Sequence, residues 1–269
     1  MTSKHIPRKR FGQNFLQDAG VIHHIVAAIN PKPQQPLVEI GPGLAALTEP
    51  LLAACGHVHV VEIDRDIVSH LQQRFSPAQL TIHQADALKF DFAALAHQIA
   101  PGEGIRLVGN LPYNISTPLL FHLADAGHAI SDMHFMLQKE VVDRIAAAPG
   151  CADYGRLSIM LQVRFRTQAI LDVPPGAFYP PPKVNSAVIR LSPWPTPPWP
   201  VAHLPTLEQL VLKSFAARRK TLRNNLRGIV NDSELTALNL DPALRPEQIS
   251  VGQYVSLANW LHAQGRGSA

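Results

Sequence analysis

The tetrapeptide Asn110-Leu111-Pro112-Tyr113 carries groups suited to chemistry on a planar exocyclic amine. It follows the apolar run 105–109, which predicts a buried strand, and open α/β sheets bind their ligands at the carboxyl ends of their strands. The Asn110 side-chain oxygen and the Leu111 carbonyl can each accept an N–H, which favours a pyramidal nitrogen whose lone pair attacks an electrophile. The Tyr113 ring can stack on a base, so the motif fits N6 of adenine. Taken alone, the tetrapeptide more often indicates a strand followed by a Pro-Tyr turn. Whether it has a function depends on the residues that follow the other predicted strands.

A glycine turn and two carboxylates follow three consecutive predicted strands. Gly41 and Gly43 lie between a strand and a helix, where the missing Cβ atoms let a ligand lie against the backbone. Glu62 ends the next strand, where a carboxylate can accept both ribose hydroxyls. Asp86 follows the third strand and can accept from the amino group of a bound adenine. Together these residues predict a nucleoside site, whereas a glycine turn with surface acids is the simpler alternative.

A dinucleotide is the competing cofactor, because Gly41-x-Gly43-x-x-Ala46 satisfies the relaxed dinucleotide-binding pattern. Pro42 removes one backbone donor that a pyrophosphate would use, and no residues suited to hydride transfer follow the fourth strand. S-adenosylmethionine contains a ribose and an adenine but no phosphate. We therefore expect S-adenosylmethionine as the cofactor.

Strand and helix patterns alternate along residues 37–148, which predicts a right-handed, mostly parallel α/β sheet covered by helices. The predicted strands are Leu37–Ile40, His57–Ile63, Leu80–His83, Ile105–Gly109 and Met133–Leu137. The predicted helices are 18–30, Leu44–Ala54, Asp66–Phe75, Phe92–Ile99, Pro118–Asp125 and Glu140–Ala148. Leu157–Phe165 is interpreted as a further helix. Thr167–Val173 and Ser186–Leu191 then predict a late hairpin at the sheet edge, joined by a stiff Pro-rich loop.

The composition changes at Ser192, where prolines become frequent. They predict a linker over residues 193–205, between an α/β domain at 1–192 and a C-terminal domain at 206–269. Thr206-x-x-Gln209 and Ser250-x-x-Gln253 have the form of helix capping boxes, each followed by a helical apolar pattern. We therefore expect the C-terminal domain to be small and entirely helical.

Charge and composition narrow the class of protein. The 269 residues are 46% hydrophobic with a net charge of +4, and the pI is near 9.2. This mild basic bias is compatible with a polyanionic partner. No apolar run is long enough to span a membrane and no signal core follows the basic start, so we expect a cytoplasmic monomer with no membrane partner. Neither the two cysteines nor the histidines have metal-ligand spacing, so no metal is expected.

Several segments resemble the bacterial small-subunit ribosomal RNA adenine dimethyltransferases, the kasugamycin-sensitivity enzymes. The resemblance covers essentially the whole chain. The segments that carry it are 8–16 (RKRFGQNFL), 39–43 (EIGPG), 109–116 (GNLPYNIS), 135–140 (FMLQKE), 154–158 (YGRLS), 180–184 (PPPKV) and 218–221 (RRKT).

The resemblance implies a class I S-adenosylmethionine-dependent methyltransferase fold, with a Rossmann-like, mostly parallel seven-stranded sheet and a late antiparallel hairpin. It implies that two adjacent adenosines near the 3′ end of small-subunit rRNA, in a pre-ribosomal particle, are dimethylated at N6. It also implies that Asn14 and Leu16 close over the cofactor alongside Gly41, Glu62, Asp86 and Asn110.

Two other functions stay open at this point. The large-subunit rRNA methyltransferases of macrolide resistance share the amine motif and the Gln-Asn-Phe-Leu arm, although the fuller arm and 218–221 favour the small-subunit enzymes. A non-enzymatic ribosome assembly factor on the same fold is the second alternative. Such a factor would not need the intact tetrapeptide, so the sequence favours an enzyme.

Arg219, Arg223 and Arg227 recur every four residues, which predicts one face of a helix. With Arg218 and Lys220 they form a possible phosphate-binding stripe. The alternative is the solvated face of an amphipathic helix.

Phe178 lies in the Pro-rich loop that the family resemblance places over the target base. A base taken out of its stack needs support on both faces, and we expect Phe178 to supply the second face opposite Tyr113. The alternative is that Phe178 anchors the loop in the core.

Overall fold

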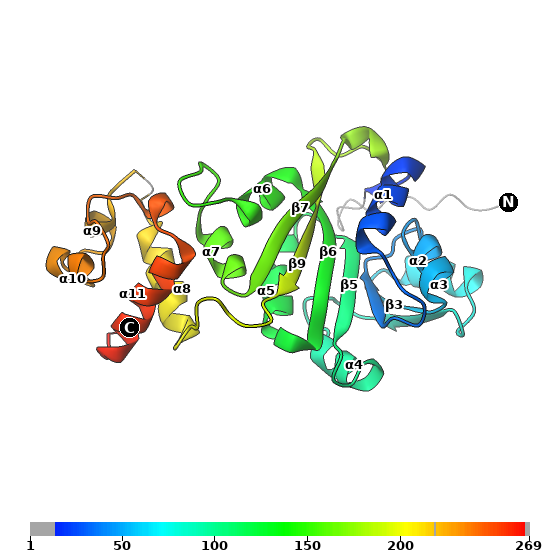
Figure 1. The fold of residues 1–269 in the computed structure, drawn as a ribbon. Coiled ribbons are helices and arrows are strands. Elements are labelled where there is room, and N and C mark those ends of the chain that lie inside the picture. The colour runs from blue at the N-terminus through cyan, green and yellow to red at the C-terminus, as the bar shows by residue number, and fades with distance from the viewer. Residues whose placement is uncertain (1–13, 218, 267–269) are drawn as a thin grey trace. The chain divides into compact units, whose positions relative to one another are not determined.

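The computed structural model describes residues 14–217 and 219–266, and these divide into two compact units. The first unit comprises the chain up to Val142 together with Gln168–Pro193, and it contains most of the sheet (Figure 1). The second comprises Asp143–Thr167 and the chain from Trp194 onward. The C-terminal helices therefore share their unit with residues 143–167, a segment that the sequence pattern assigned to the α/β domain.

The main sheet has seven strands in the order β4-β3-β2-β5-β6-β9-β7. Their bounds are β2 Leu37–Ile40, β3 Val58–Glu62, β4 Leu80–Gln84, β5 Ile105–Asn110, β6 Ile130–Gln138, β7 Phe165–Val173 and β9 Ser186–Pro193. The strands from β4 to β6 are parallel to their neighbours, and β9 is antiparallel to β6. A second sheet consists of β1 (Phe15–Leu16) and β8 (Phe178–Tyr179). The predicted sheet and its late hairpin are confirmed.

The strand order reverses between β2 and β5, which is where open α/β sheets form a ligand crevice. The register of β2 with β3 and β5 brings the carboxyl ends of these three strands level with one another. Ile40 is opposite Val61, and Glu39 lies between Val60 and Val108. The segments that follow β2, β3 and β5 therefore meet at one edge of the sheet.

The helices of the first unit are α1 Ala19–Ile29, α2 Thr48–Cys55, α3 Arg65–Arg74, α4 Phe92–Ile99 and α5 Ser116–Asp125, and α6 Lys139–Ala146 crosses into the second unit. The predicted helix from Leu44 is wrong in its first turn, because α2 starts only at Thr48. Gly43 and Ala45 have φ values of +54° and +71°, in the left-handed region that an α-helix cannot include. Among the described residues, short 3₁₀ turns occur at Gly127–Ala129, Pro175–Ala177 and Pro246–Gln248.

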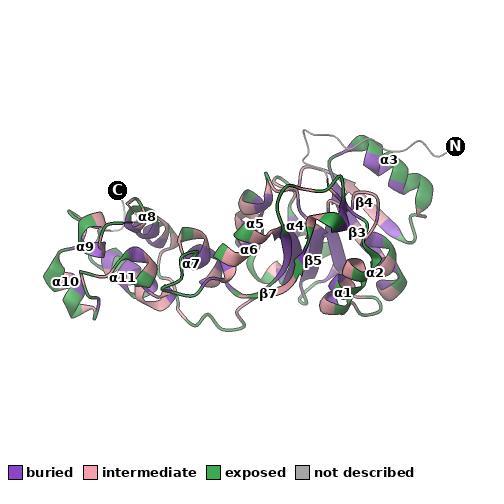
Figure 2. Cartoon of the chain, turned by 90° about the horizontal axis from the view of Figure 1, so that it is seen from above, coloured by how far each residue is buried: buried purple, intermediate pink, exposed green. Residues whose placement is uncertain are grey.

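The central strands are buried between the helices (Figure 2), and their apolar side chains form the core. One buried ion pair joins neighbouring strands near their starts: Arg106 Nε donates to Asp132 Oδ1 at 2.8 Å, and Arg106 Nη2 donates to Asp132 Oδ2 at 2.9 Å. Burial alone would raise the pKa of Asp132, but the neighbouring His134 ring, 3.6 Å away, and the hydrogen bonds from Arg106 lower it to about 2. The same guanidinium donates to the Ile29 carbonyl, so the pair also holds the end of α1.

The second unit contains α7 Arg156–Gln162, α8 Leu204–Ser214, α9 Leu222–Asn225, α10 Asp232–Ala237 and α11 Val251–Ala263. The capping box at Ser250 and Gln253 is confirmed. The one at Thr206 is wrong, because α8 already begins at Leu204 with Pro205 in its first turn. Within the described part of the chain, no helix is both long and apolar enough to cross a membrane.

The Pro-rich segment 193–205 packs on α11. Asn259 accepts from the Ala202 amide and donates to the Pro200 carbonyl, each at 2.8 Å. Gly252 faces Trp199 so closely that a Cβ there would lie 2.7 Å from the indole nitrogen. Residues 199–202 of the segment are therefore held against the helix.

Candidate active site

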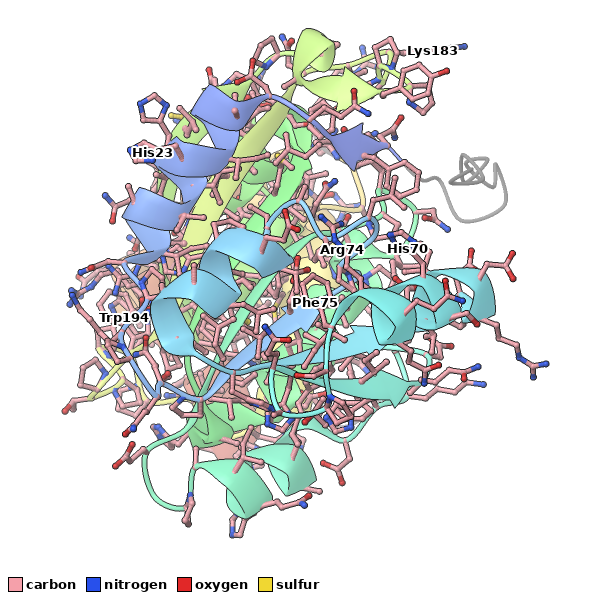
Figure 3. All side chains as sticks on the ribbon, turned by 90° about the vertical axis from the view of Figure 1, so that its right-hand side faces the viewer. His23, His70, Arg74, Phe75, Lys183 and Trp194 are labelled. Carbon is pink, nitrogen blue, oxygen red and sulfur yellow. The ribbon has the colours of Figure 1, made fainter. Side chains whose placement is uncertain are left out.

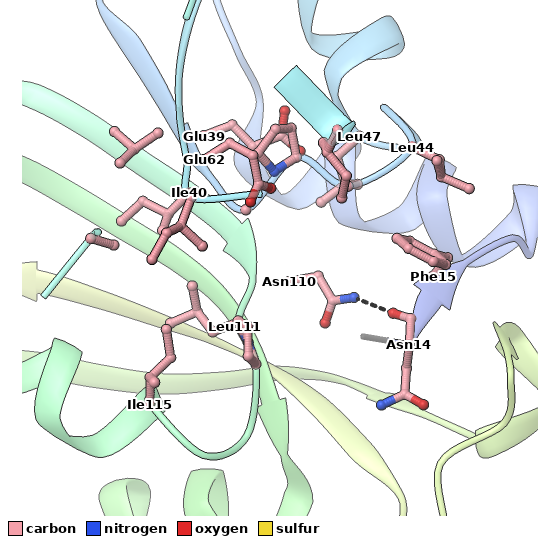
Figure 4. Close-up of a pocket in the computed structure, with 18 of the residues that line it drawn as sticks. Asn14, Phe15, Glu39, Ile40, Leu44, Leu47, Glu62, Asn110, Leu111 and Ile115 are labelled. Carbon is pink, nitrogen blue, oxygen red and sulfur yellow. Dashed lines mark hydrogen bonds between the residues drawn. The ribbon is translucent and has the colours of Figure 1, made fainter. Parts of the chain in front are cut away.

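A cavity of about 260 Å³ opens at the carboxyl ends of β2, β3 and β5 (Figure 4). Its lining includes every residue that the sequence or the resemblance placed at the cofactor and the amine. These are Asn14, Leu16, Gly41, Glu62, Asp86, Asn110, Leu111, Pro112 and Tyr113. Segments far apart in the chain are therefore brought to one site, as the strand pattern predicted.

Glycines shape the floor of this pocket. Gly41 and Gly43 have φ values of +67° and +54°, a conformation that favours glycine. A Cβ on Gly43 would lie 3.1 Å from the Phe15 ring, so β1 packs directly on the turn. Gly109 is a residue that the sequence analysis gave no role. A Cβ there would meet the Ile40 carbonyl oxygen at 2.4 Å, so glycine is required where β5 passes the end of β2.

Two carboxyl groups lie buried side by side at the pocket. Glu62 is 7% exposed, and burial raises its pKa although the Asp64, Ile63 and Gly43 amides donate to it. Glu39 is 2% exposed and accepts a 2.6 Å hydrogen bond from Thr48 Oγ1. Burial raises the pKa of Glu39 to about 7, the Thr48 bond opposes this, and the Glu62 charge adds to it. Of the two, only Glu62 was predicted to bind the cofactor, yet both line the cavity.

Asp86 follows β4 in a half-buried loop. Its Oδ1 accepts from the Leu88 amide at 3.0 Å, a local bond that orients the carboxylate at the rim of the pocket.

The Asn110 amide has a defined orientation. Its Nδ2 donates to the Asn14 carbonyl oxygen at 3.0 Å (Figure 4). The side-chain oxygen therefore occupies the other branch of the amide, where it is available as the acceptor that an amine needs. Asn14 thus contributes through its backbone, a role that no side-chain pattern could reveal.

Tyr113 is fixed by a residue far away in the sequence. Its Oη is hydrogen-bonded to Ser186 Oγ at 2.6 Å, and Ser186 is fully buried at the start of β9. Burial raises the pKa of Tyr113 and the Ser186 bond lowers it, so the phenol stays neutral at ordinary pH. The ring therefore has a set orientation before any base arrives.

Phe178 is not placed as predicted. Its side chain is 4% exposed and belongs to the hydrophobic core with Met136, Val173 and Val188. It does not line the pocket. The ring faces inward because β8 pairs with β1 and turns this side chain toward the sheet. The structure therefore favours the core-anchor alternative.

The predicted basic helix face is also wrong in its geometry. α9 covers only Leu222–Asn225, so Arg219 lies in a turn before it and Arg227 beyond its end. Tertiary contacts set these limits, because the Leu222 amide bonds the Leu244 carbonyl and Leu226 is buried. Arg223 is within 3.3 Å of Asp232. Arg218 and the basic N-terminal residues up to Gln13 lie outside the described residues, so a role in RNA binding stays a prediction.

Among the residues that the structure describes, no group of three or more His, Cys, Asp or Glu side chains is arranged to hold a metal ion. Cys55 is buried and Cys151 exposed.

Comparisons with known proteins agree on one family. The family model for ribosomal RNA adenine dimethylase matches residues 4–263. Ribosomal RNA small subunit methyltransferase A of Laribacter hongkongensis is 58% identical over 98% of this chain and 99% of its own length. The protein of that name from Pseudomonas aeruginosa is 52% identical over 96% of both chains.

Solved structures show the same fold. A dimethyladenosine transferase from Plasmodium falciparum superposes with a TM-score of 0.76 at 24% identity, over 93% of this chain and 98% of that one. The 23S rRNA methyltransferase ErmE superposes with a TM-score of 0.71 at 25% identity, over 93% of this chain and 100% of that one. The predicted methyltransferase fold is confirmed. Because the family model spans nearly the whole chain, the protein belongs to the ribosomal RNA adenine dimethylase family and is an rRNA adenine dimethyltransferase.

Proposed function

We propose that this protein transfers methyl groups from S-adenosylmethionine to N6 of two adjacent adenosines near the 3′ end of small-subunit rRNA, giving N6,N6-dimethyladenosine. One observation carries the proposal: the nucleoside-binding acids and the amine-binding tetrapeptide line a single cavity. We place the reaction in the cytoplasm, on rRNA in a pre-ribosomal particle, with the chain acting as a monomer in small-subunit biogenesis.

The cavity fits the cofactor in shape and in chemistry. The glycine turn leaves room against the backbone, and Glu62 and Asp86 supply acceptors for the ribose hydroxyls and the adenine amino group. The buried Glu39 adds a negative charge when ionised, which suits a ligand that carries ammonium and sulfonium groups. When bound, S-adenosylmethionine supplies an electrophilic methyl group.

The protein's own contribution to the transfer is to bind the adenine amine. In the first transfer the Asn110 side-chain oxygen and the Leu111 carbonyl accept the two N–H groups and aim the nitrogen lone pair at the methyl group, and in the second the methylated amine offers its one remaining N–H. Each transfer ends with the loss of one amine proton to solvent. Positive charge grows on that nitrogen as the bond forms, so both acceptors bind the transition state more tightly than the substrate. The Tyr113 ring, held by Ser186, supports one face of the base.

Curated relatives favour the small subunit over the large one as the source of the RNA. Those of 52–59% identity carry the small-subunit name, whereas the large-subunit enzyme ErmE shares 25% identity. The two kinds of enzyme methylate adenine in the same way and differ in which rRNA they bind.

A methyl-transfer assay tests the proposal. Small subunits that lack the modification are incubated with the protein and labelled S-adenosylmethionine, with large subunits in parallel, and the modified nucleotides are identified by mass spectrometry. The expected result is dimethyladenosine at two neighbouring positions of the small-subunit rRNA. Label only in large subunits would support the macrolide-resistance type of activity, and binding without label would support an assembly factor.

A further inference from the structure

The two residues of β8 have opposite environments. Phe178 is 4% exposed, whereas the next ring along the chain, that of Tyr179, is 60% exposed. Successive side chains of a strand point to opposite faces, so burial of Phe178 directs Tyr179 outward. An aromatic ring with most of its surface in water is a feature that folding itself does not require.

Register places Tyr179 beside a residue of the pocket wall. Phe15 and Tyr179 are directly opposite in the β1–β8 pair, and opposite residues share a face. The Phe15 ring lies over Gly43 in the pocket wall, and Tyr179 is not itself among the lining residues. Tyr179 therefore lies next to a lining residue but outside the cavity, at its rim.

The surroundings of this ring are stiff and basic. The Ala177 carbonyl accepts from the Gln17 amide at 2.8 Å, and Phe178 anchors the strand in the core. Three consecutive prolines follow Tyr179, and Lys183 after them projects from the loop into solvent (Figure 3). An anchored aromatic residue and an exposed cation in one loop are the combination that binds unpaired nucleotides, by stacking on the base and attracting the phosphate.

We propose that Tyr179 is the stacking platform for the base next to the target adenine in the rRNA. This inference rests on the proposed function. Tyr113 lies in the cavity and supports the adenine that reacts, whereas Tyr179 is outside and can reach only a neighbouring nucleotide. The site thus holds two consecutive unstacked bases, one in the cavity and one at its rim.

Steady-state methylation of unmodified small subunits tests this, with wild type, Tyr179→Phe and Tyr179→Leu. Tyr179→Phe keeps the ring, and Tyr179→Leu keeps apolar bulk without it. Loss of one base–aromatic stack should raise KM for the small subunit roughly tenfold in Tyr179→Leu, with KM near wild type in Tyr179→Phe. Leu212→Ala, which trims another exposed apolar side chain, on α8, is the matched control and should keep the wild-type KM.

Cofactor affinity and thermal unfolding are measured on the same variants. Both should stay at wild-type values, because the Tyr179 side chain is largely in solvent and outside the cavity. Suppose that the wild-type protein methylates the rRNA. If Tyr179→Leu then has the wild-type KM, or if KM rises as much in Tyr179→Phe as in Tyr179→Leu, the inference is wrong and the proposed function stands. A higher KM in Tyr179→Leu matched by weaker cofactor binding would also overturn it, by showing damage to β1. An inactive wild type would instead refute the proposed function.

Discussion

Glu62 is predicted to contribute to cofactor binding but not to the rate of methyl transfer. Ribose hydroxyls are bound equally before and during methyl transfer, so Glu62→Gln should raise the dissociation constant for S-adenosylmethionine and leave kcat at saturating cofactor largely intact. Calorimetry measures the first quantity and initial rates the second. Asp64→Asn is a close comparison, because Asp64 donates its amide to Glu62 but is not among the residues that line the cavity. An unchanged dissociation constant in Glu62→Gln would move the ribose site elsewhere.

Glu39 makes cofactor binding depend on pH. Its pKa in the folded protein is about 7, above the usual 4.5, so the protonated carboxyl favours folding below pH 4.5 and this contribution is lost as pH rises through 7. A cationic cofactor binds the ionised form better, so affinity should fall as pH drops from about 8 to about 6. Glu39→Gln keeps an acceptor for Thr48 and should flatten this dependence. Equal wild-type affinity at both pH values, measured by calorimetry, would contradict this role.

Phe178 anchors the two-residue strand β8, which pairs with β1 beside the pocket. Its ring is packed under the β1–β8 pair, which carries Asn14 and Phe15 to the pocket. Phe178→Ala should cost about 3–5 kcal/mol of unfolding free energy, the usual range for a buried Phe. Denaturant unfolding measures this loss, and Tyr179→Ala should change stability far less. A Phe178→Ala variant of wild-type stability whose rRNA methylation is impaired would restore the stacking role.

The sequence predicted the elements that local patterns can specify. Ile105–Gly109 is apolar except for Arg106 and forms a buried strand, and Gly41 and Glu62 lie at strand ends whose positions follow from alternation. Other features depend on contacts between distant residues. Nothing near Tyr113 indicates Ser186, and a two-residue strand has no period to show that Phe178 faces inward. The Arg219–Arg227 spacing is helical, yet tertiary hydrogen bonds limit α9 to four residues.

At the scale of the whole molecule, exposed basic residues of the second unit are predicted to bind the rRNA phosphates. Arg219, Lys220 and Arg227 are exposed, whereas Arg223 is paired with Asp232. Neutralising the first three together should weaken small-subunit binding and lower the salt slope by about one unit for each phosphate that is no longer bound. Arg223→Gln should lower it less, and neither change should affect cofactor affinity. Salt titrations that give an unaltered slope would assign these residues to an ordinary solvated turn.

The central claim is that Asn110 joins cofactor and adenine in a single catalytic site. Its most direct test is the rate of dimethyladenosine formation on unmodified small subunits at saturating S-adenosylmethionine, for wild type and Asn110→Ala. Losing one preorganised acceptor of the transition state should lower the rate by roughly two to three orders of magnitude. Asn110→Ala turning over at the wild-type rate would contradict the account.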